Sequence, residues 1–257
     1  MVRQFVALVG ELDGRGYFEK RFGKDCVDAP SDIDPADVIE HEIGISGLWP
    51  LPTERLTGDV DLFCDLLEVL HDIVARPEIR HMHPYAGCGW HHDGFSIETG
   101  RAVYRWRVNQ LLARSELQLR LAASGEDIGR MVEITDDRRA DLVAAMVSRD
   151  DGDVGDQIRH AVALFRARAT DKHQKRSAVI VLANVLEERR SLIKAELLSK
   201  DEDALFMIAN KFSIRHQQES QRSDYDPVFL DWVFWWYLAT IELTDRLVAR
   251  AASQEVW

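Results

Sequence analysis

Apolar residues recur with a helical period through the C-terminal half of the chain. Residues 157–169 and 174–198 each place apolar side chains three and four positions apart, which is the spacing of one helix face. Directly afterwards, Ser199 is followed three residues later by Glu202, the spacing of a capping box, and this predicts the start of another helix. The pattern indicates a bundle of helices in this half.

A final helix is predicted to begin at Asp226 and Pro227 and to run to about Arg250. Aspartate is a favoured N-cap, and proline is favoured at the first helical position. This helix carries aromatic residues on more than one side, namely Phe229, Trp232, Trp235, Trp236 and Tyr237. We therefore expect it to lie at the centre of the bundle or in a dimer interface.

The N-terminal half contains shorter apolar periods. The clearest predicts a helix over residues 58–75, capped by Thr57 and ended by Pro77. Further helices are predicted over residues 3–12, 16–22, 35–42, 100–113 and 137–148.

Strand-like alternation occurs in one place. Leucines at 117, 119 and 121 alternate with other residues, Ser124-Gly125 forms a turn, and residues 128–134 add a second apolar run. We predict a β-hairpin here and no other sheet, with the Gly-punctuated segment HMHPYAGCGWHHDGFS as an irregular loop. The acidic stretch from Ser148 to Asp156 is the expected domain boundary, giving domains 1–150 and 156–252 in a mainly α protein.

Charge is unevenly distributed along the chain. The formal net charge of -12 argues against a generic nucleic-acid surface or an anionic membrane as the main partner. Residues 1–155 hold 17 Lys and Arg against 29 Asp and Glu, whereas residues 156–250 hold 15 against 14. The asymmetry favours two domains, of which the acidic N-terminal one could contact a protein partner.

The cysteines and the N-terminus indicate a cytoplasmic location. Cys26, Cys64 and Cys88 are few, odd in number and widely spaced, which is typical of free thiols in a reducing compartment. The first residues lack the apolar core of a signal peptide, and no apolar run reaches the roughly 18 residues of a membrane span.

The main candidate for chemistry is the pair Arg215 and His216, where the apolar stripe of the preceding helix ends. Guanidinium binds phosphate in a bidentate manner, and imidazole exchanges protons near neutral pH. Together they suit metal-independent attack of an RNA 2′-hydroxyl on its own phosphate. The alternative is a helix C-terminus whose cations only complement the helix dipole.

The residues around this pair carry a family resemblance. Asn210-x-Phe212-x-Ile214-Arg215-His216, followed by Tyr225-Asp226-Pro227, resembles the C-terminal module of bacterial proteins related to the AbiJ-like abortive-infection group and the HEPN superfamily. The resemblance covers about residues 156–250. GYFEKRFGKDCVD, LWPL and CGWHHDGF in the N-terminal half resemble the partner region of the same group, which implies a sensor or regulatory domain.

The resemblance implies a HEPN-like bundle that acts as a homodimer in antiviral defence or as a toxin, binds RNA or a nucleotide, and includes metal-independent ribonucleases. Arg215 and His216 would be catalytic, while Asn210, Gln221 and Arg222 would bind the substrate. The family's further histidine is absent, since Gln217 to Arg222 contain none. A regulatory or dimerisation module without catalysis is therefore the alternative.

Two other clusters deserve comparison. The first comprises five potential metal ligands within a dozen residues, namely His81, His83, Cys88, His91 and His92. Zinc accepts histidine nitrogen and cysteine sulfur, but a paired Cys-x2-Cys motif is missing, so a packed loop is preferred and no cofactor is expected. The second is basic and could hold phosphates, although a solvated turn is the more frequent explanation; its residues are Arg166, Arg168, Lys172, His173, Lys175 and Arg176.

The sequence contains no P-loop, no G-x-G-x-x-G, no G-x-S-x-G and no H-E-x-x-H. Phosphate-cradling NTPases, dinucleotide-dependent enzymes, serine hydrolases of the α/β class and metalloproteases of the zincin type are therefore not supported.

Overall fold

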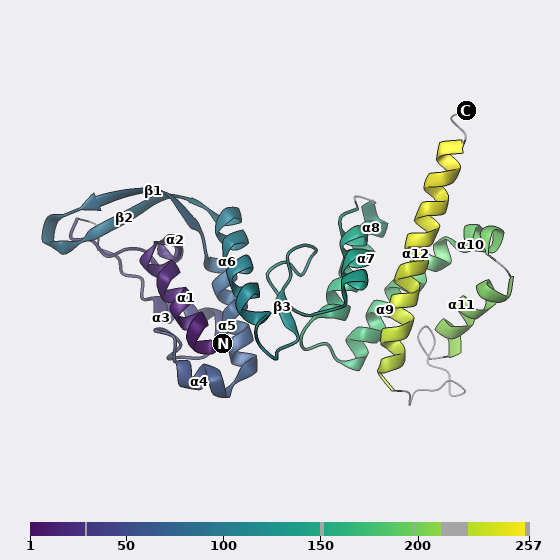
Figure 1. The fold of residues 1–257 in the computed structure, drawn as a ribbon, viewed down its shortest axis with the longest axis horizontal. Coiled ribbons are helices and arrows are strands. Elements are labelled where there is room, and N and C mark those ends of the chain that lie inside the picture. Colours follow the sequence, from purple (N-terminus) through teal and green to yellow (C-terminus); the bar gives the residue numbers. More distant parts are fainter. Residues whose placement is uncertain (29, 150–151, 198, 212–225, 255–257) are drawn as a thin grey trace. The chain divides into compact units, whose positions relative to one another are not determined.

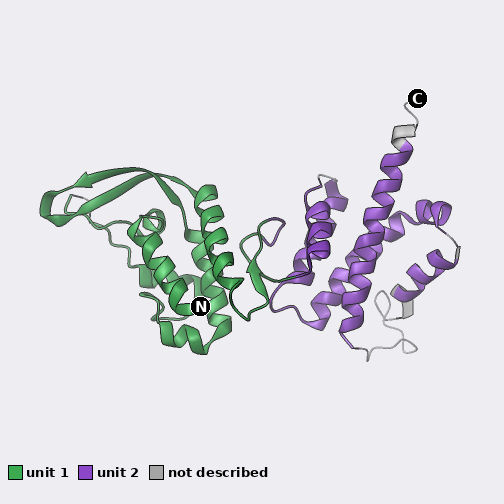
Figure 2. Cartoon of the chain, in the orientation of Figure 1, with its two compact units in different colours: residues 1–123, 128–134 green, residues 124–127, 135–257 purple. Residues whose placement is uncertain are grey.

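A computed structural model describes the chain over residues 1–28, 30–149, 152–197, 199–211 and 226–254. The chain forms two compact units (Figure 1, Figure 2): unit 1 holds residues 1–123 and 128–134, and unit 2 holds residues 124–127 and 135–257. Helices dominate both, and the strands among the described residues form two small antiparallel sheets, so the mainly α fold is confirmed. Among the described helices, none combines the length and apolar character needed to cross a membrane.

Unit 1 packs helices around one apolar core and adds both sheets. Its elements are α1 (Val2–Gly14), α2 (Glu19–Phe22), α3 (Pro35–Ile43), α4 (Thr53–Gly58), α5 (Val60–Ile73), β1 (Arg76–His83), the 3-10 turn η1 (Tyr85–Gly87), β2 (Gly89–Ser96), α6 (Ile97–Leu112), β3 (Leu119–Leu121) and β4 (Met131–Glu133).

Helix α5 lies at the centre of the unit 1 core. Its apolar face is fully buried through Leu62, Phe63, Cys64, Leu66, Leu67 and Leu70. Asp59 caps it by accepting a 2.9 Å hydrogen bond from the Leu62 amide, so the predicted cap, Thr57, was wrong. The buried Tyr104 hydroxyl donates to the Leu67 carbonyl at 3.1 Å and fixes α6 against α5.

The predicted hairpin at residues 117–134 is confirmed as β3 and β4. Asn109 of α6 attaches it to the core, because its side chain donates to the Leu121 carbonyl at 3.0 Å and accepts from the Leu121 amide at 2.8 Å. The expectation of a single sheet was wrong. The segment interpreted as an irregular loop forms a second, longer hairpin, β1 with β2, that pairs Arg76 with Ser96 and His83 with Gly89.

A buried histidine lies beneath the β3–β4 hairpin. The His71 side chain is 2% exposed; its Nδ1 lies 3.1 Å from an Asp72 carboxylate oxygen and its Nε2 lies 2.9 Å from Nη1 of Arg105. Arg105 can only donate, so Nε2 accepts and Nδ1 carries the proton of a neutral ring. A side chain on Gly129 would come within 2.2 Å of this ring, which leaves room only for glycine. Burial lowers the pKa of His71 to about 4.

This burial predicts an acid-sensitive stability. The unfolded ring takes up a proton near pH 6.5 and the folded ring only near pH 4, so the free energy of unfolding falls as pH falls through this window. The loss reaches at most about 3 kcal/mol. Urea unfolding of the wild type and of His71→Asn at several pH values measures it, since other titrating groups cancel in the comparison. Equal pH dependence in the two proteins would contradict the assignment.

Unit 2 is a helical bundle whose core spans all its helices. Its elements are α7 (Asp137–Val147), α8 (Gly152–Arg166), α9 (Lys172–Glu188), α10 (Arg190–Glu196), α11 (Ser199–Lys211) and α12 (Val228–Gln254). The units divide near residue 134 and not within the predicted boundary at 148–156, because Val143, Met146 and Val147 pack into the core of unit 2. Phe165 of α8 and Phe234 of α12 stack there with centroids 3.7 Å apart.

One predicted helix start is confirmed, and one predicted helix is divided in two. Asp226 caps α12 by accepting a 2.9 Å hydrogen bond from the Val228 amide, as predicted. The predicted capping box involves the Ser199 side chain, which lies outside the described residues; the Glu202 carboxylate pairs with Arg190 at 3.1 Å. The single helix predicted over 174–198 is broken at Arg189, which separates α9 from α10.

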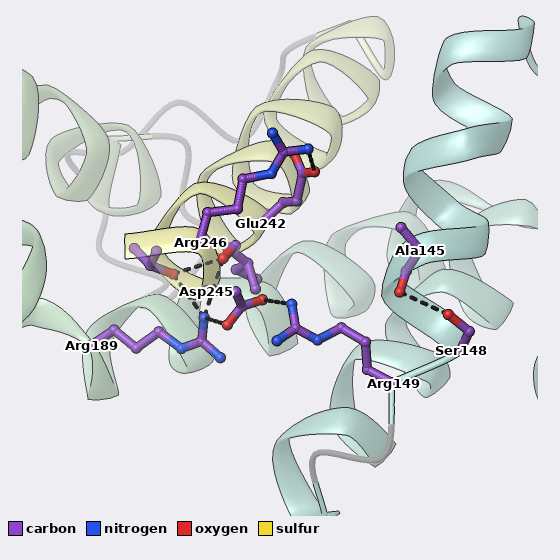
Figure 3. A network of polar contacts seen from close by, with 9 residues as sticks. Ala145, Ser148, Arg149, Arg189, Glu242, Asp245 and Arg246 are labelled. Atoms are coloured by element: carbon purple, nitrogen blue, oxygen red, sulfur yellow. Dashed lines mark hydrogen bonds and ion pairs between the residues drawn. The ribbon is translucent and has the colours of Figure 1, made fainter. Parts of the chain in front are cut away.

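The break at Arg189 coincides with a buried ionic network (Figure 3). One oxygen of Asp245, whose side chain is 8% exposed, lies 2.5 Å from Nη1 of Arg189, and the other lies 2.5 Å from Nη1 of Arg149. Arg189 also donates to the Thr244 hydroxyl at 2.7 Å and the Ile241 carbonyl at 3.2 Å. The carboxylate of α12 thus joins the end of α7 to the junction of α9 and α10.

Asp245→Ala should destabilise unit 2 by about 2–3 kcal/mol, because it leaves two arginines without their shared carboxylate. Chemical denaturation followed by tryptophan fluorescence measures the change. Glu242→Ala, one turn earlier on α12, removes a carboxylate whose partner Arg246 is 75% exposed, and is the matched control with little expected effect. An equal loss in both variants would show that the network adds nothing.

Candidate metal centre

The turn of the β1–β2 hairpin brings three potential metal ligands together. Antiparallel pairing sets His81 opposite His91 and His83 opposite Gly89, so His83 and His91 project from the same face. Ala86, Gly87 and Gly89 have positive φ values, and this tight turn returns the chain so that Cys88 joins the two histidines.

The fourth ligand comes from a distant part of the chain. Cys26 lies in the loop that follows α2, 57 residues before His83. One ligand atom from each of Cys26, His83, Cys88 and His91 lies within 4.8 Å of the other three, and all four side chains are half-buried. We call these residues the four-residue cluster. It includes three of the five residues that the sequence singled out, together with Cys26, which the sequence analysis did not connect to them.

Two distances from Cys26 to other members of the four-residue cluster match those around a tetrahedral metal. Bonds of about 2.3 Å to sulfur and about 2.0 Å to nitrogen place two sulfurs about 3.8 Å apart, and a sulfur and a nitrogen about 3.5 Å apart. Sγ of Cys26 lies 3.8 Å from Sγ of Cys88 and 3.4 Å from Nδ1 of His83. The two sulfurs are free thiols, well beyond the roughly 2.05 Å of a disulfide.

Each histidine of the cluster has a feature that fits a metal ligand. Nε2 of His83, on the side of the ring away from Cys26, lies 3.2 Å from a carboxylate oxygen of Asp28. A carboxylate on the second nitrogen fixes the ring and makes the first a better ligand. His91 has a buried Nε2 without a hydrogen-bond partner among the described residues. A buried polar nitrogen costs stability when it is unsatisfied, and a bound cation is one partner that offsets this cost.

The remaining two histidines of the hairpin have other partners. His81 is exposed and lies 3.1 Å from Asp93 on the neighbouring strand. His92 projects from the opposite face of the hairpin, where its Nδ1 lies 2.9 Å from Glu19 and its ring packs against Gly16. The five-residue set suggested by the sequence is therefore divided between a metal-like cluster and two ion pairs.

The predicted nucleic-acid residues fall mostly outside the described part of the chain. Arg215, His216, Gln221 and Arg222 lie outside the described residues, and Asn210 lies in α11 with its side chain outside the description. The predicted basic cluster lies in unit 2, where Arg166 pairs with Asp127 at 3.3 Å and Lys175 with Asp231 at 2.9 Å. The charges of these two members are balanced within the fold.

Comparison of the chain with protein-family models, with curated proteins and with solved structures finds no match.

Proposed function

We propose that Cys26, His83, Cys88 and His91 bind one zinc ion that fixes the hairpin of unit 1. The observation that carries the proposal is the approach of four ligand atoms to within 4.8 Å of one another. Two thiolates and two imidazoles are a donor set that zinc prefers, and the distances from Cys26 to Cys88 and to His83 fit a tetrahedron.

The composition of the site favours a structural zinc. Catalytic zinc sites keep a position open for water or substrate, whereas four protein ligands close the coordination shell. The hairpin also needs such support, because the described residues of β1 and β2 contain no fully buried side chain. A two-stranded hairpin is marginally stable by itself in water. Zinc would join its turn to the loop that carries Cys26.

Metal analysis of the purified full-length chain tests this site. We expect about one zinc per chain, and loss of most of it in His83→Ala, because three ligands hold zinc less tightly than four. His81→Ala is the matched control, since His81 lies on the same strand face and pairs with Asp93 instead. A second pair compares Cys26→Ser, which should lose zinc, with Cys64→Ala, which should keep it.

Stability provides the second measurement. Zinc binding stabilises the folded state by mass action, so chelation should lower the thermal midpoint of the wild type and change that of His83→Ala little. A wild type that stays free of metal after refolding with zinc, or equal zinc content in His81→Ala and His83→Ala, would refute the proposal.

For unit 2 we propose, on the resemblance to HEPN proteins, that the bundle binds RNA, with Arg215 holding phosphate and His216 as acid or base. Two features support this proposal. The motif lies in the sequence between α11 and α12, whose start is capped by Asp226, and unit 2 is a bundle of helices, as the resemblance implies. A cytoplasmic abortive-infection or toxin-type role and a homodimer belong to the same proposal. A regulatory or dimerisation module without catalysis is its alternative.

Incubation of the protein with total RNA in the presence of a chelator tests the catalytic form. Cleavage by the wild type should persist, since the proposed chemistry needs no metal, and Arg215→Ala should lower it by at least about a hundredfold. Arg246→Ala on the exposed face of α12 is a control for the lost charge. Equal cleavage by all three proteins would remove Arg215 from the mechanism. Binding without cleavage would favour the regulatory alternative.

A further inference from the structure

The β1–β2 hairpin has two faces of different chemistry. Successive side chains of a strand alternate between faces, and directly paired residues share one. His83 and His91 therefore lie on one face, whereas Arg76, Arg80 and Trp90 lie on the other, Arg80 paired with His92 and Trp90 with Met82. The second face takes no part in the four-residue cluster.

A pocket of about 530 Å³ lies on this second face. The end of α1 and the residues after it supply Arg15 and Tyr17, and the hairpin supplies Arg76, Glu78, Arg80 and Trp90. We call this set the arginine pocket. Its volume lies in the range of pockets that hold small molecules, about 300–1,000 Å³.

The arginine pocket carries positive charge in an acidic part of the chain. Within the described residues, neither Arg76 nor Arg80 has a carboxylate within 4.0 Å. Arg15 pairs with Glu11 at 3.1 Å, and that carboxylate also binds Arg107 at 2.8 Å. Glu78 is the one acidic residue of the lining, so three guanidinium groups face one lining carboxylate. Guanidinium groups without an acidic partner are suited to bind phosphate in a bidentate manner.

Aromatic surface adjoins these charges. Trp90 is 46% exposed, and the guanidinium carbon of Arg80 lies 4.7 Å from the centroid of its ring. Tyr17, which is half-buried, also lines the pocket. A cation–π pair alone would account for Arg80 and Trp90. It does not account for Arg76 and Arg15, which line the same pocket and, among the described residues, make no cation–π pair with the indole.

We propose that the arginine pocket binds a phosphorylated nucleoside, either free or as part of a single strand. Arg76 and Arg80 contact the phosphate, and Trp90 stacks on the base, as aromatic side chains do in single-strand binding. This site goes beyond the proposed zinc site and lies in unit 1, apart in sequence from Arg215. Zinc would act on the pocket only by holding the hairpin that carries Arg76, Glu78, Arg80 and Trp90.

Titration calorimetry on the full-length, zinc-loaded chain tests the pocket with adenosine 5′-monophosphate, short single-stranded oligoadenylate, adenosine and inorganic phosphate. We expect Arg80→Ala to weaken nucleotide binding by at least about tenfold, because one charge-assisted contact to phosphate is lost. Arg3→Ala, an exposed arginine at the start of α1, removes the same charge elsewhere and should bind as the wild type does.

Trp90→Ala separates the two parts of the proposed contact. It should weaken binding of the nucleotide and the oligonucleotide while inorganic phosphate binds as before, because only the base stacks on the indole. Circular dichroism and zinc content of each variant show whether the hairpin is intact, and Arg80→Lys, which keeps the charge, covers the case in which Arg80→Ala does not fold.

Each outcome decides a part of the proposal. If the monophosphate binds and its binding depends on Arg80, the ligand is a free nucleotide. If only the oligonucleotide binds, the ligand is a single strand. Three results would each overturn the proposal. Adenosine could bind as tightly as its monophosphate, Arg80→Ala could bind the nucleotide as tightly as Arg3→Ala does, or none of the probes could bind. Metal analysis is a separate measurement, so failure of the zinc site and failure of the pocket can be told apart.

Discussion

The β1–β2 hairpin projects from unit 1 without a hydrophobic face of its own, and this constraint governs the functional surface of that unit (Figure 1). Burial of apolar area is the main driving force of folding, and the hairpin has little of it. Its position is instead determined by polar contacts at separate points. His92 meets Glu19 near the middle of the hairpin, and the four-residue cluster joins its turn to the loop of Cys26. A metal crosslink can stabilise a segment that does not pack into a hydrophobic core.

Unit 2 is stabilised in a different way. Its helices share a continuous apolar core, and one buried carboxylate, Asp245, joins α12 to the end of α7 and to the junction of α9 and α10. The carboxylate also explains the break between α9 and α10. Arg189 leaves helical geometry at the position where its guanidinium reaches Asp245, Thr244 and the Ile241 carbonyl. Apolar packing holds the bundle together, and the ionic network lies where α9 ends and α10 begins.

The sequence predicted the elements whose apolar residues recur with a regular period, and it missed the elements that lack such a period. Helix α5 and the β3–β4 hairpin were predicted because their side chains alternate or recur toward a core. The β1–β2 hairpin was missed because residues such as His81, Met82 and Trp90 are exposed and give no alternation of apolar and polar positions. Cys26 was missed because 57 residues separate it from His83, and only the fold brings the two together. The residues proposed to bind RNA stay a prediction.

The strand register connects the two proposed sites of unit 1. If β1 slipped by one residue along β2, every side chain of β1 would move to the other face of the hairpin. The same slip would therefore remove His83 from the four-residue cluster and Arg80 from the arginine pocket. The turn opposes such a slip, since Gly87 and Gly89 adopt backbone angles that other residues rarely take. Cys88 lies between these two glycines, so a ligand held by zinc would lock the register at the point where it is set. Metal binding would therefore fix which face presents the arginines, without any contact between the ion and the pocket.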